Sequence, residues 1–239
     1  MEPVPEAWHC GVVVVAHPDD IEYGTAAAVA RWVRQGKDIR YVLATSGEAG
    51  IAGLQPAQSA PVREDEERAS ARIVGVDSVE FLGHPDGRLV AGLELRRDIA
   101  AAIRRHRPEM VVTAHFGATW FPGVLNSADH RALGICVLDA VADAANEWIF
   151  PELTRDGYEP WAQVRWIAVN TPTPTHGVDV TETVEIAERS LAAHRRYLEA
   201  LSATDVAEQA RAQVQTASQA LPGFPAERAV GFELFTVTG

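Results

Sequence analysis

The sequence predicts an α/β fold in which a mostly parallel sheet is flanked by helices. Apolar runs alternate with segments of helical periodicity, which is typical of parallel strands joined by crossover helices. The first run, GVVVVA at residues 11–16, holds four consecutive valines, as expected for a strand buried on both faces. A chain of 239 residues with 47% hydrophobic and 23% charged residues is long enough for one large core. We therefore expect residues 1–239 to form a single domain.

Six apolar runs and five helical patterns define the expected elements. The strands are expected at 11–16, 39–45, 79–82, 110–114, 164–170 and 231–237. The helices are expected at 21–35, 62–74, 93–105, 129–145 and 181–201. Gly36 and Gly75 follow two of these helical patterns at the position of a left-handed C-cap, and Pro108 closes another.

Charge and composition exclude several classes of protein. With 21 Lys and Arg against 33 Asp and Glu, the net charge of −12 argues against nucleic acid or an anionic membrane surface as a partner. No run approaches the ~18 apolar residues of a membrane span. The start, MEPVPEAWHC, lacks the basic and apolar parts of a signal peptide, so we expect a cytoplasmic protein. Two cysteines, Cys10 and Cys136, do not suggest a disulfide framework.

The stretch AHPDD follows the first expected strand and carries the first candidate site residues. Ligands of open α/β sheets bind at the carboxyl ends of the strands, where His17 and Asp20 would lie. His130, in NSADHRALG after the fourth expected strand, offers a third ligand. Two histidines and one carboxylate with an open fourth position suit catalytic zinc. Asp19 would then accept a proton from a metal-bound water.

A purely structural interpretation competes with this one. An aspartate at a strand end often caps the following helix, and Asp19 or Asp20 would suit that role. The acidic doublet is not isolated, however, because the pair Asp129 and His130 follows a second strand. This repetition favours a metal site, although a capping or turn role for Asp19 stays open.

Four motifs together carry a family resemblance. AHPDD, TSGEAG at 45–50, FLGHPDG at 81–87 and ADHRALG at 128–134 resemble, in order and spacing, the LmbE-like or PIG-L family of zinc-dependent de-N-acetylases. The resemblance covers roughly residues 10–135. It implies a Rossmann-like, LmbE-like fold and removal of acetyl from an N-acetylglucosamine unit, with amine and acetate as the products.

The resemblance also assigns roles to individual residues. His17, Asp20 and His130 correspond to the family's zinc ligands, and Asp19 corresponds to its general base. Arg63 and Asp86 resemble residues that hold sugar hydroxyls. For Arg63 an alternative stays open, because an arginine next to Glu64 and near Glu67 is also typical of an exposed helical pair.

One position departs from the family pattern. Where members commonly have a histidine that polarises the scissile carbonyl, this chain has Ser127, which we place at the substrate. A candidate to take over the role of that histidine is His194, which lies on the apolar stripe of the expected helix 181–201 and should face inward. It is either a core histidine bonded to a carbonyl, or a group from this chain or a neighbouring subunit that polarises the acetyl carbonyl. We adopt the second hypothesis.

The sequence therefore predicts a zinc-dependent amidohydrolase that acts on a small N-acetylated glycoside. Members of the family often assemble as trimers or hexamers, so a homo-oligomer is one possibility, and the sequence does not fix the oligomeric state. Two alternatives remain. A metal-dependent phosphoesterase would often hold two metals and more carboxylates. A catalytically altered member that only binds its ligand is suggested by Ser127, although such a protein would not need the base Asp19.

Overall fold

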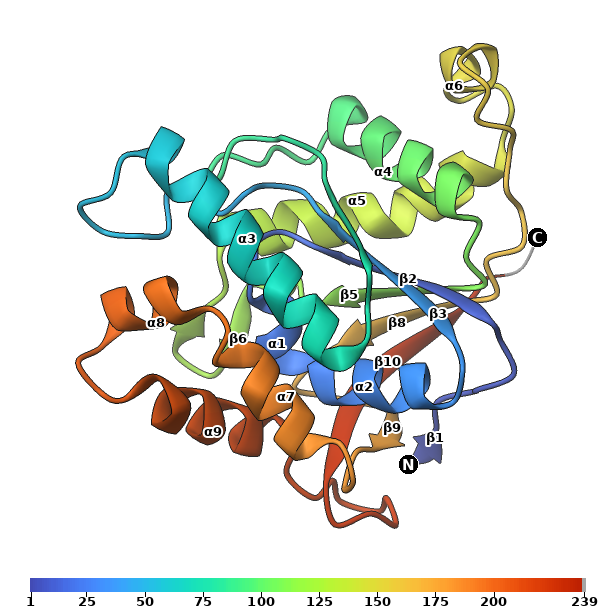
Figure 1. Ribbon diagram of the computed structural model, residues 1–239. Helices are drawn as coiled ribbons and strands as arrows, with labels where there is room; N and C mark the ends of the chain where they lie inside the picture. The colour runs from blue at the N-terminus through green and yellow to red at the C-terminus, as the bar shows by residue number, and fades with distance from the viewer. Residues whose placement is uncertain (238–239) are drawn as a thin grey trace.

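The computed structural model describes residues 1–237, and its centre is a mixed sheet with mostly parallel strands (Figure 1). Within these residues the strand order is β1-β9-β10-β8-β5-β2-β3-β4. Only β10 runs antiparallel to its neighbours, β8 and β9. The strands are β1 Glu2–Pro3, β2 Cys10–Val15, β3 Asp38–Leu43, β4 Ser78–Phe81, β5 Met110–Ala114, β8 Trp166–Asn170, β9 His176–Asp179 and β10 Ala229–Thr236.

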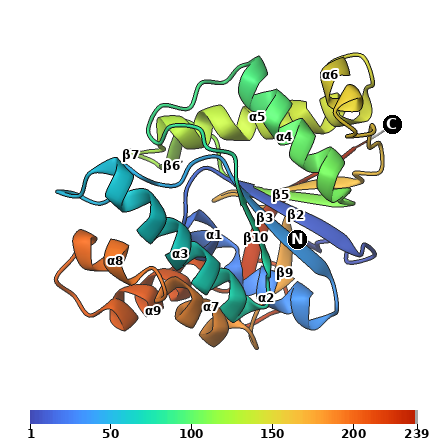
Figure 2. The same ribbon diagram turned by 45° about the horizontal axis from the view of Figure 1, so that its top comes forward.

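Helices cover both faces of this sheet (Figures 1 and 2). One face packs against α2, α3, α7 and α9, and the other against α4 and α5. The helices are α1 Asp20–Gly24, α2 Ala26–Arg34, α3 Pro56–Val74, α4 Leu93–His106, α5 Ala128–Ala145, α6 Pro151–Arg155, α7 Val184–Leu191, α8 Arg195–Leu201 and α9 Val206–Ala217. The α/β class and the mostly parallel sheet are thus confirmed.

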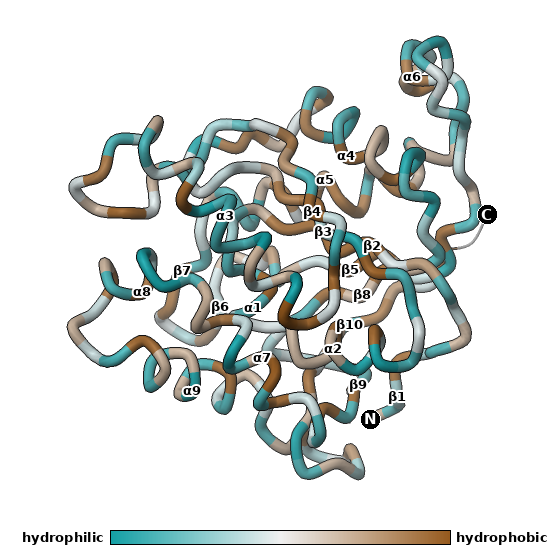
Figure 3. The backbone as a smooth tube through the Cα atoms, in the orientation of Figure 1, coloured by the Kyte–Doolittle hydropathy of each residue, from teal (hydrophilic) through white to brown (hydrophobic). Residues whose placement is uncertain are grey.

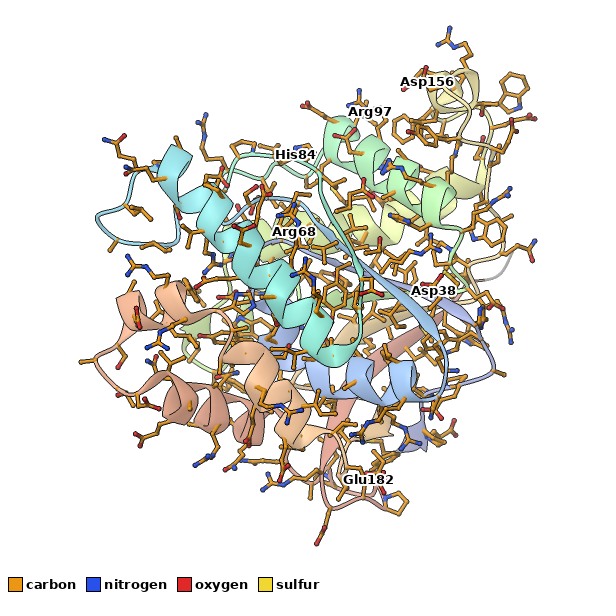
Figure 4. All side chains as sticks on the ribbon, in the orientation of Figure 1. Asp38, Arg68, His84, Arg97, Asp156 and Glu182 are labelled. Atoms are coloured by element: carbon orange, nitrogen blue, oxygen red, sulfur yellow. The ribbon has the colours of Figure 1, made fainter. Side chains whose placement is uncertain are left out.

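The valines of β2 explain why this strand is central. Val13 and Val15 pack into the core under α2 and α3, while Val12 and Val14 pack under α4 and α5. The strand is therefore buried on both faces, as the sequence predicted. Figure 3 shows hydrophobic residues along the strands and polar residues on the outer turns of the helices. Charged side chains such as Asp156 and Glu182 lie on the outside (Figure 4).

The expected helix 181–201 is wrong as a single element. The chain forms α7, breaks at residues 192–194 and starts α8 at Arg195, with the backbone of His194 outside the helical region at φ −76° and ψ 51°. Propensity does not forbid a continuous helix here, but the break places the His194 side chain among buried acids. The helix α9 and the short hairpin of β6 (Thr119–Phe121) and β7 (Val124–Leu125) were not predicted.

The order of the strands reverses at β2. From β2 the chain moves outward to β3 and β4, and then returns to β5 on the other side of β2. Ligands bind at such a reversal, outside the carboxyl ends of the two strands. Among residues 1–237, no helix is both long and apolar enough to cross a membrane.

Candidate metal centre

The turn after β2 is shaped by the carboxylate of Asp20. Its Oδ2 accepts hydrogen bonds from the backbone N–H of Ala16 at 3.1 Å and of His17 at 2.8 Å. The side chain therefore folds back over the strand end instead of capping α1 in the usual direction. Its second oxygen, Oδ1, is left for a contact with His130.

The structure brings the three predicted ligands together. His130, in the first turn of α5, places Nε2 2.9 Å from Asp20 Oδ1. His17 places Nδ1 3.4 Å from Asp20 Oδ2. One donor atom from each of the three side chains lies within 4.8 Å of the others. Two imidazoles and one carboxylate at this separation are the donor set of a catalytic zinc site.

The far side of the His17 ring is also held. Its Nε2 lies 3.1 Å from Asp86 Oδ1 and 3.2 Å from Asp129 Oδ2. Asp129 is buried and also accepts the backbone N–H groups of Gly87 and Leu89. A histidine that binds a metal usually donates its other N–H to such a carboxylate, which fixes its orientation. His17 therefore has the surroundings of a metal ligand.

The charges at this centre favour a cation. Burial opposes protonation of His17, but the charge of Asp20 and the hydrogen bonds to Asp129, Asp20 and Asp86 raise its pKa to about 12. Burial also opposes ionisation of Asp20, yet His130 and His17 hold its pKa well below the usual range. A site that draws a positive charge onto an imidazole so strongly is electrostatically suited to a divalent metal.

Asp19 stands beside these residues in a strained backbone conformation. Its φ of 85° lies in the left-handed region, and its side chain makes no capping hydrogen bond to α1. Its backbone N–H donates to Glu67 Oε2 at 3.0 Å, which holds this conformation. The capping interpretation of Asp19 is therefore wrong. Strained residues of this kind cluster at functional sites.

The carboxylate of Asp19 is buried and only partly paired. Its Oδ2 has no hydrogen-bond partner within the described residues and lies 3.5 Å from Arg63 Nη1. Burial raises the pKa of Asp19 to about 6, although the positive charge of Arg63 acts in the opposite direction. A carboxylate with a free oxygen and a pKa near neutrality has the properties of a general base.

Arg63 and Asp86 both lie at the centre, but Arg63 is not an exposed residue. Its side chain is only 2% exposed, its Nη2 donates to Pro18 O, and its guanidinium lies 3.7 Å from the ring centre of Tyr197. The alternative of a helical surface pair is therefore wrong. Asp86 is half-buried, and its Oδ2 accepts the backbone N–H of Ala49.

Ser127 serves the helix that carries His130. Its Oγ accepts the backbone N–H of His130 at 3.0 Å and so caps α5. This bond fixes where the helix begins, and with it the position of His130 in the first turn. The hydroxyl that replaces the usual histidine thus has a structural partner of its own.

The placement of His194 does not fit its expected contact with the acetyl carbonyl. The side chain is completely buried, and its Nε2 lies 3.4 Å from Glu22 Oε2 and 3.6 Å from Glu67 Oε2. The inward orientation is confirmed, but the ring faces carboxylates behind Asp19. Burial opposes its protonation, yet the hydrogen bond and charge of Glu22 raise its pKa to about 9. The corrected interpretation is a completely buried histidine next to the carboxylates of Glu22 and Glu67.

The sequence reasoning missed four buried polar residues around the centre. Three of them left a signal, and for two it is direct proximity, since Asp129 directly precedes His130 and Glu22 follows Asp20 by two residues. Glu67 stands four residues after Arg63, on the same face of α3, which a helical projection would show. Asn126 gave no such signal.

Comparison with known proteins identifies close parallels. The family model described as PIG-L, GlcNAc-PI de-N-acetylase, matches residues 12–141. A diacetylchitobiose deacetylase from Thermococcus kodakarensis is 28% identical over 184 residues, which cover 74% of this chain and 66% of that protein. A 1D-myo-inositol 2-acetamido-2-deoxy-alpha-D-glucopyranoside deacetylase from Streptomyces scabiei is 30% identical over 237 residues, 86% of this chain and 68% of that protein.

Solved structures show the same fold. The N,N'-diacetylchitobiose deacetylase from Pyrococcus horikoshii superposes on this chain with a TM-score of 0.85 at 23% identity. The matched residues are 97% of this chain and 85% of that chain. GalB, the 4-carboxy-2-hydroxymuconate hydratase from Pseudomonas putida, superposes with a TM-score of 0.68 at 20% identity. The matched residues are 97% of this chain and 98% of that chain. Enzymes named for different reactions therefore share this architecture, so the fold alone does not define the chemistry.

The extent of the match decides what these relatives show. The chain spans 66% of the Thermococcus protein and 33% of a Mycobacterium deacetylase that it also matches. The family model, in contrast, matches residues 12–141, more than half of the 239 residues, and this range includes both candidate histidine ligands. The chain belongs to the PIG-L family.

Proposed function

We propose that the protein is a zinc-dependent de-N-acetylase that hydrolyses the acetamide of an N-acetylglucosamine-type sugar or glycoconjugate. The names of its relatives support this substrate class, since they are deacetylases of diacetylchitobiose and of an acetamido-deoxy-glucopyranoside of inositol. Within this chain, the observation that carries the proposal is the buried Oδ2 of Asp19, which accepts no hydrogen bond from the described residues, beside the donor set of His17, Asp20 and His130.

In the proposed mechanism His17, Asp20 and His130 would hold the zinc ion. The ion would supply Lewis-acid activation of a water molecule and of the acetyl carbonyl. Asp19 accepts a proton from the attacking water at Oδ2 and later gives it to the leaving amine nitrogen. Water thus adds to the amide, the C–N bond breaks, and amine and acetate leave.

Arg63 and Asp86 have supporting roles in this proposal. The Arg63 guanidinium, held by Pro18 O and the ring of Tyr197, keeps a positive charge 3.5 Å from Asp19 Oδ2. This charge keeps Asp19 ionised at neutral pH despite its burial. Asp86 lies against His17, with Oδ1 3.1 Å from His17 Nε2 and Oδ2 bonded to the backbone N–H of Ala49, and we propose that it meets sugar hydroxyls next to the zinc site.

The geometry argues against a phosphoesterase with two metals. Two other groups of donors exist in the described residues. The first of them, His17, Asp86 and Asp129, shares His17 with the proposed zinc site. The other, Glu22, Glu67 and His194, is buried away from it, and His194 Nε2 already lies 3.4 Å and 3.6 Å from its two carboxylates. Asp129 is also committed to the backbone N–H groups of Gly87 and Leu89. We therefore infer one metal per chain, which elemental analysis measures directly.

The test of the proposed reaction is a mass-spectrometric screen of N-acetylated glycosides with zinc-loaded protein. Loss of one acetyl group, abolished by a chelator and restored by zinc, is the expected result. The matched control is Asp19→Asn, which should keep the metal but lose about 10²–10⁴-fold in turnover, because an amide does not accept the proton. Phosphate release, or equal turnover in Asp19→Asn, contradicts the proposal.

A further inference from the structure

The amide of Asn126 has only one orientation that satisfies its neighbours. The side chain is buried, between β7 and α5. Its Nδ2 donates to the carbonyls of His115 at 2.8 Å and Gly117 at 3.1 Å, and its Oδ1 accepts the backbone N–H of Ser127 at 2.8 Å. Because carbonyls only accept and a backbone N–H only donates, exchanging the amide's oxygen and nitrogen would break all three bonds.

This orientation fixes the tautomer of His130. Asn126 Oδ1 lies 2.9 Å from His130 Nδ1. An amide oxygen has no hydrogen to give, so Nδ1 must carry the hydrogen of this bond. A neutral imidazole carries one hydrogen, and its Nε2 is therefore bare. That bare nitrogen faces Asp20 Oδ1 at 2.9 Å, where two lone pairs require a cation or a proton between them.

From this accounting we propose that Asn126 is a positioning residue for the metal centre, which selects the tautomer of His130 and fixes its ring. The two histidines are then oriented by different chemistry: His17 by the carboxylates of Asp129 and Asp86, and His130 by a neutral amide. Partners of this kind typically change metal affinity by about 10–100-fold when removed. The inference rests on the proposed metal site and is independent of the reaction.

Two substitutions separate this role from simple anchoring of the loop. Asn126→Ala and Asn126→Asp both remove the hydrogen bonds donated to His115 and Gly117. Only Asn126→Asp keeps an oxygen that accepts from His130 Nδ1. We expect zinc affinity, measured by competition with a chelator, to fall about 10–100-fold in Asn126→Ala and clearly less in Asn126→Asp. Equal losses in both variants, or no loss in Asn126→Ala, overturn the inference.

A spectroscopic measurement tests the same claim without any substitution at residue 126. In ¹⁵N NMR spectra of the zinc-loaded parent protein, His130 should carry its hydrogen on Nδ1 and not on Nε2. The opposite tautomer overturns the inference even if an Asn126 variant does not fold. His130→Ala distinguishes a wrong metal site from a wrong role for Asn126. If it binds zinc like the parent, the proposed metal site fails; if it loses zinc while Asn126→Ala does not, only the role of Asn126 fails.

Discussion

Replacing Glu67 with alanine tests how the strained backbone of Asp19 is maintained. Glu67 is completely buried on α3, and its Oε2 accepts the Asp19 N–H at 3.0 Å. The same oxygen lies 3.6 Å from His194 Nε2. In Glu67→Ala, the amide of Asp19 loses its partner in a site without water access, and His194 loses one of the two carboxylates that pair with it, the other being Glu22.

The expected cost follows from these contacts. Leaving the buried N–H of Asp19 without an acceptor costs about 1–3 kcal/mol, and a left-handed backbone at a residue other than glycine costs about 1–3 kcal/mol to maintain. Burial of Glu67 raises its pKa well above the usual range, as does the charge of Glu22, so removal of this unfavourably placed carboxyl group offsets part of the loss. We expect the free energy of unfolding to fall by about 2–3 kcal/mol.

Urea unfolding of metal-free protein measures this difference without the added stability of bound zinc. Asp65→Ala, on the same helix, is the matched control, because the Asp65 side chain is 85% exposed and its loss should change stability by less than about 0.5 kcal/mol. Glu67→Gln keeps an acceptor for the Asp19 N–H and should recover part of the stability. If Glu67→Ala is as stable as Asp65→Ala, the support of Asp19 by Glu67 is refuted.

Two further predictions concern the buried histidine and the helix cap. Because the pKa of His194 is raised from 6.5 to about 9, its stabilising contribution is complete below pH 6.5 and is lost as the pH rises through 9. The free energy of unfolding should therefore fall over this range in the parent and change less in His194→Gln, as measured by urea unfolding at each pH. Ser127→Ala should destabilise the metal-free protein by about 1 kcal/mol, since it removes the N-cap of α5; an unchanged unfolding midpoint would contradict this role.

The sequence predicted structural features correctly where the signal lies in neighbouring residues. Four consecutive valines predict the central strand because burial on both faces leaves no polar position, and His17, Asp20 and His130 follow strand ends that a parallel sheet brings to one edge. Gly36 and Gly75 do adopt positive φ after α2 and α3, as their spacing predicted. The single domain over residues 1–239 stays a prediction.

The sequence was insufficient where the environment comes from distant segments. Periodicity places His194 on an inward face, but it does not show the break between α7 and α8, nor the neighbouring Glu22 and Glu67, which lie more than a hundred residues earlier. Asn126 resembles an ordinary loop residue until its amide is seen between the carbonyls of His115 and Gly117. Side-chain partners at such separations are set by tertiary packing, which a single sequence does not show.

The central claim is that His17, Asp20 and His130 hold one metal ion, and zinc analysis of purified variants tests it most directly. The measurement is zinc bound per chain, together with its affinity in competition with a chelator, for the parent, His17→Ala, His130→Ala and Asp19→Asn. The account predicts one tightly bound zinc in the parent and in Asp19→Asn, and loss of tight binding in both histidine variants. Parent-like zinc binding in His17→Ala and His130→Ala would contradict it.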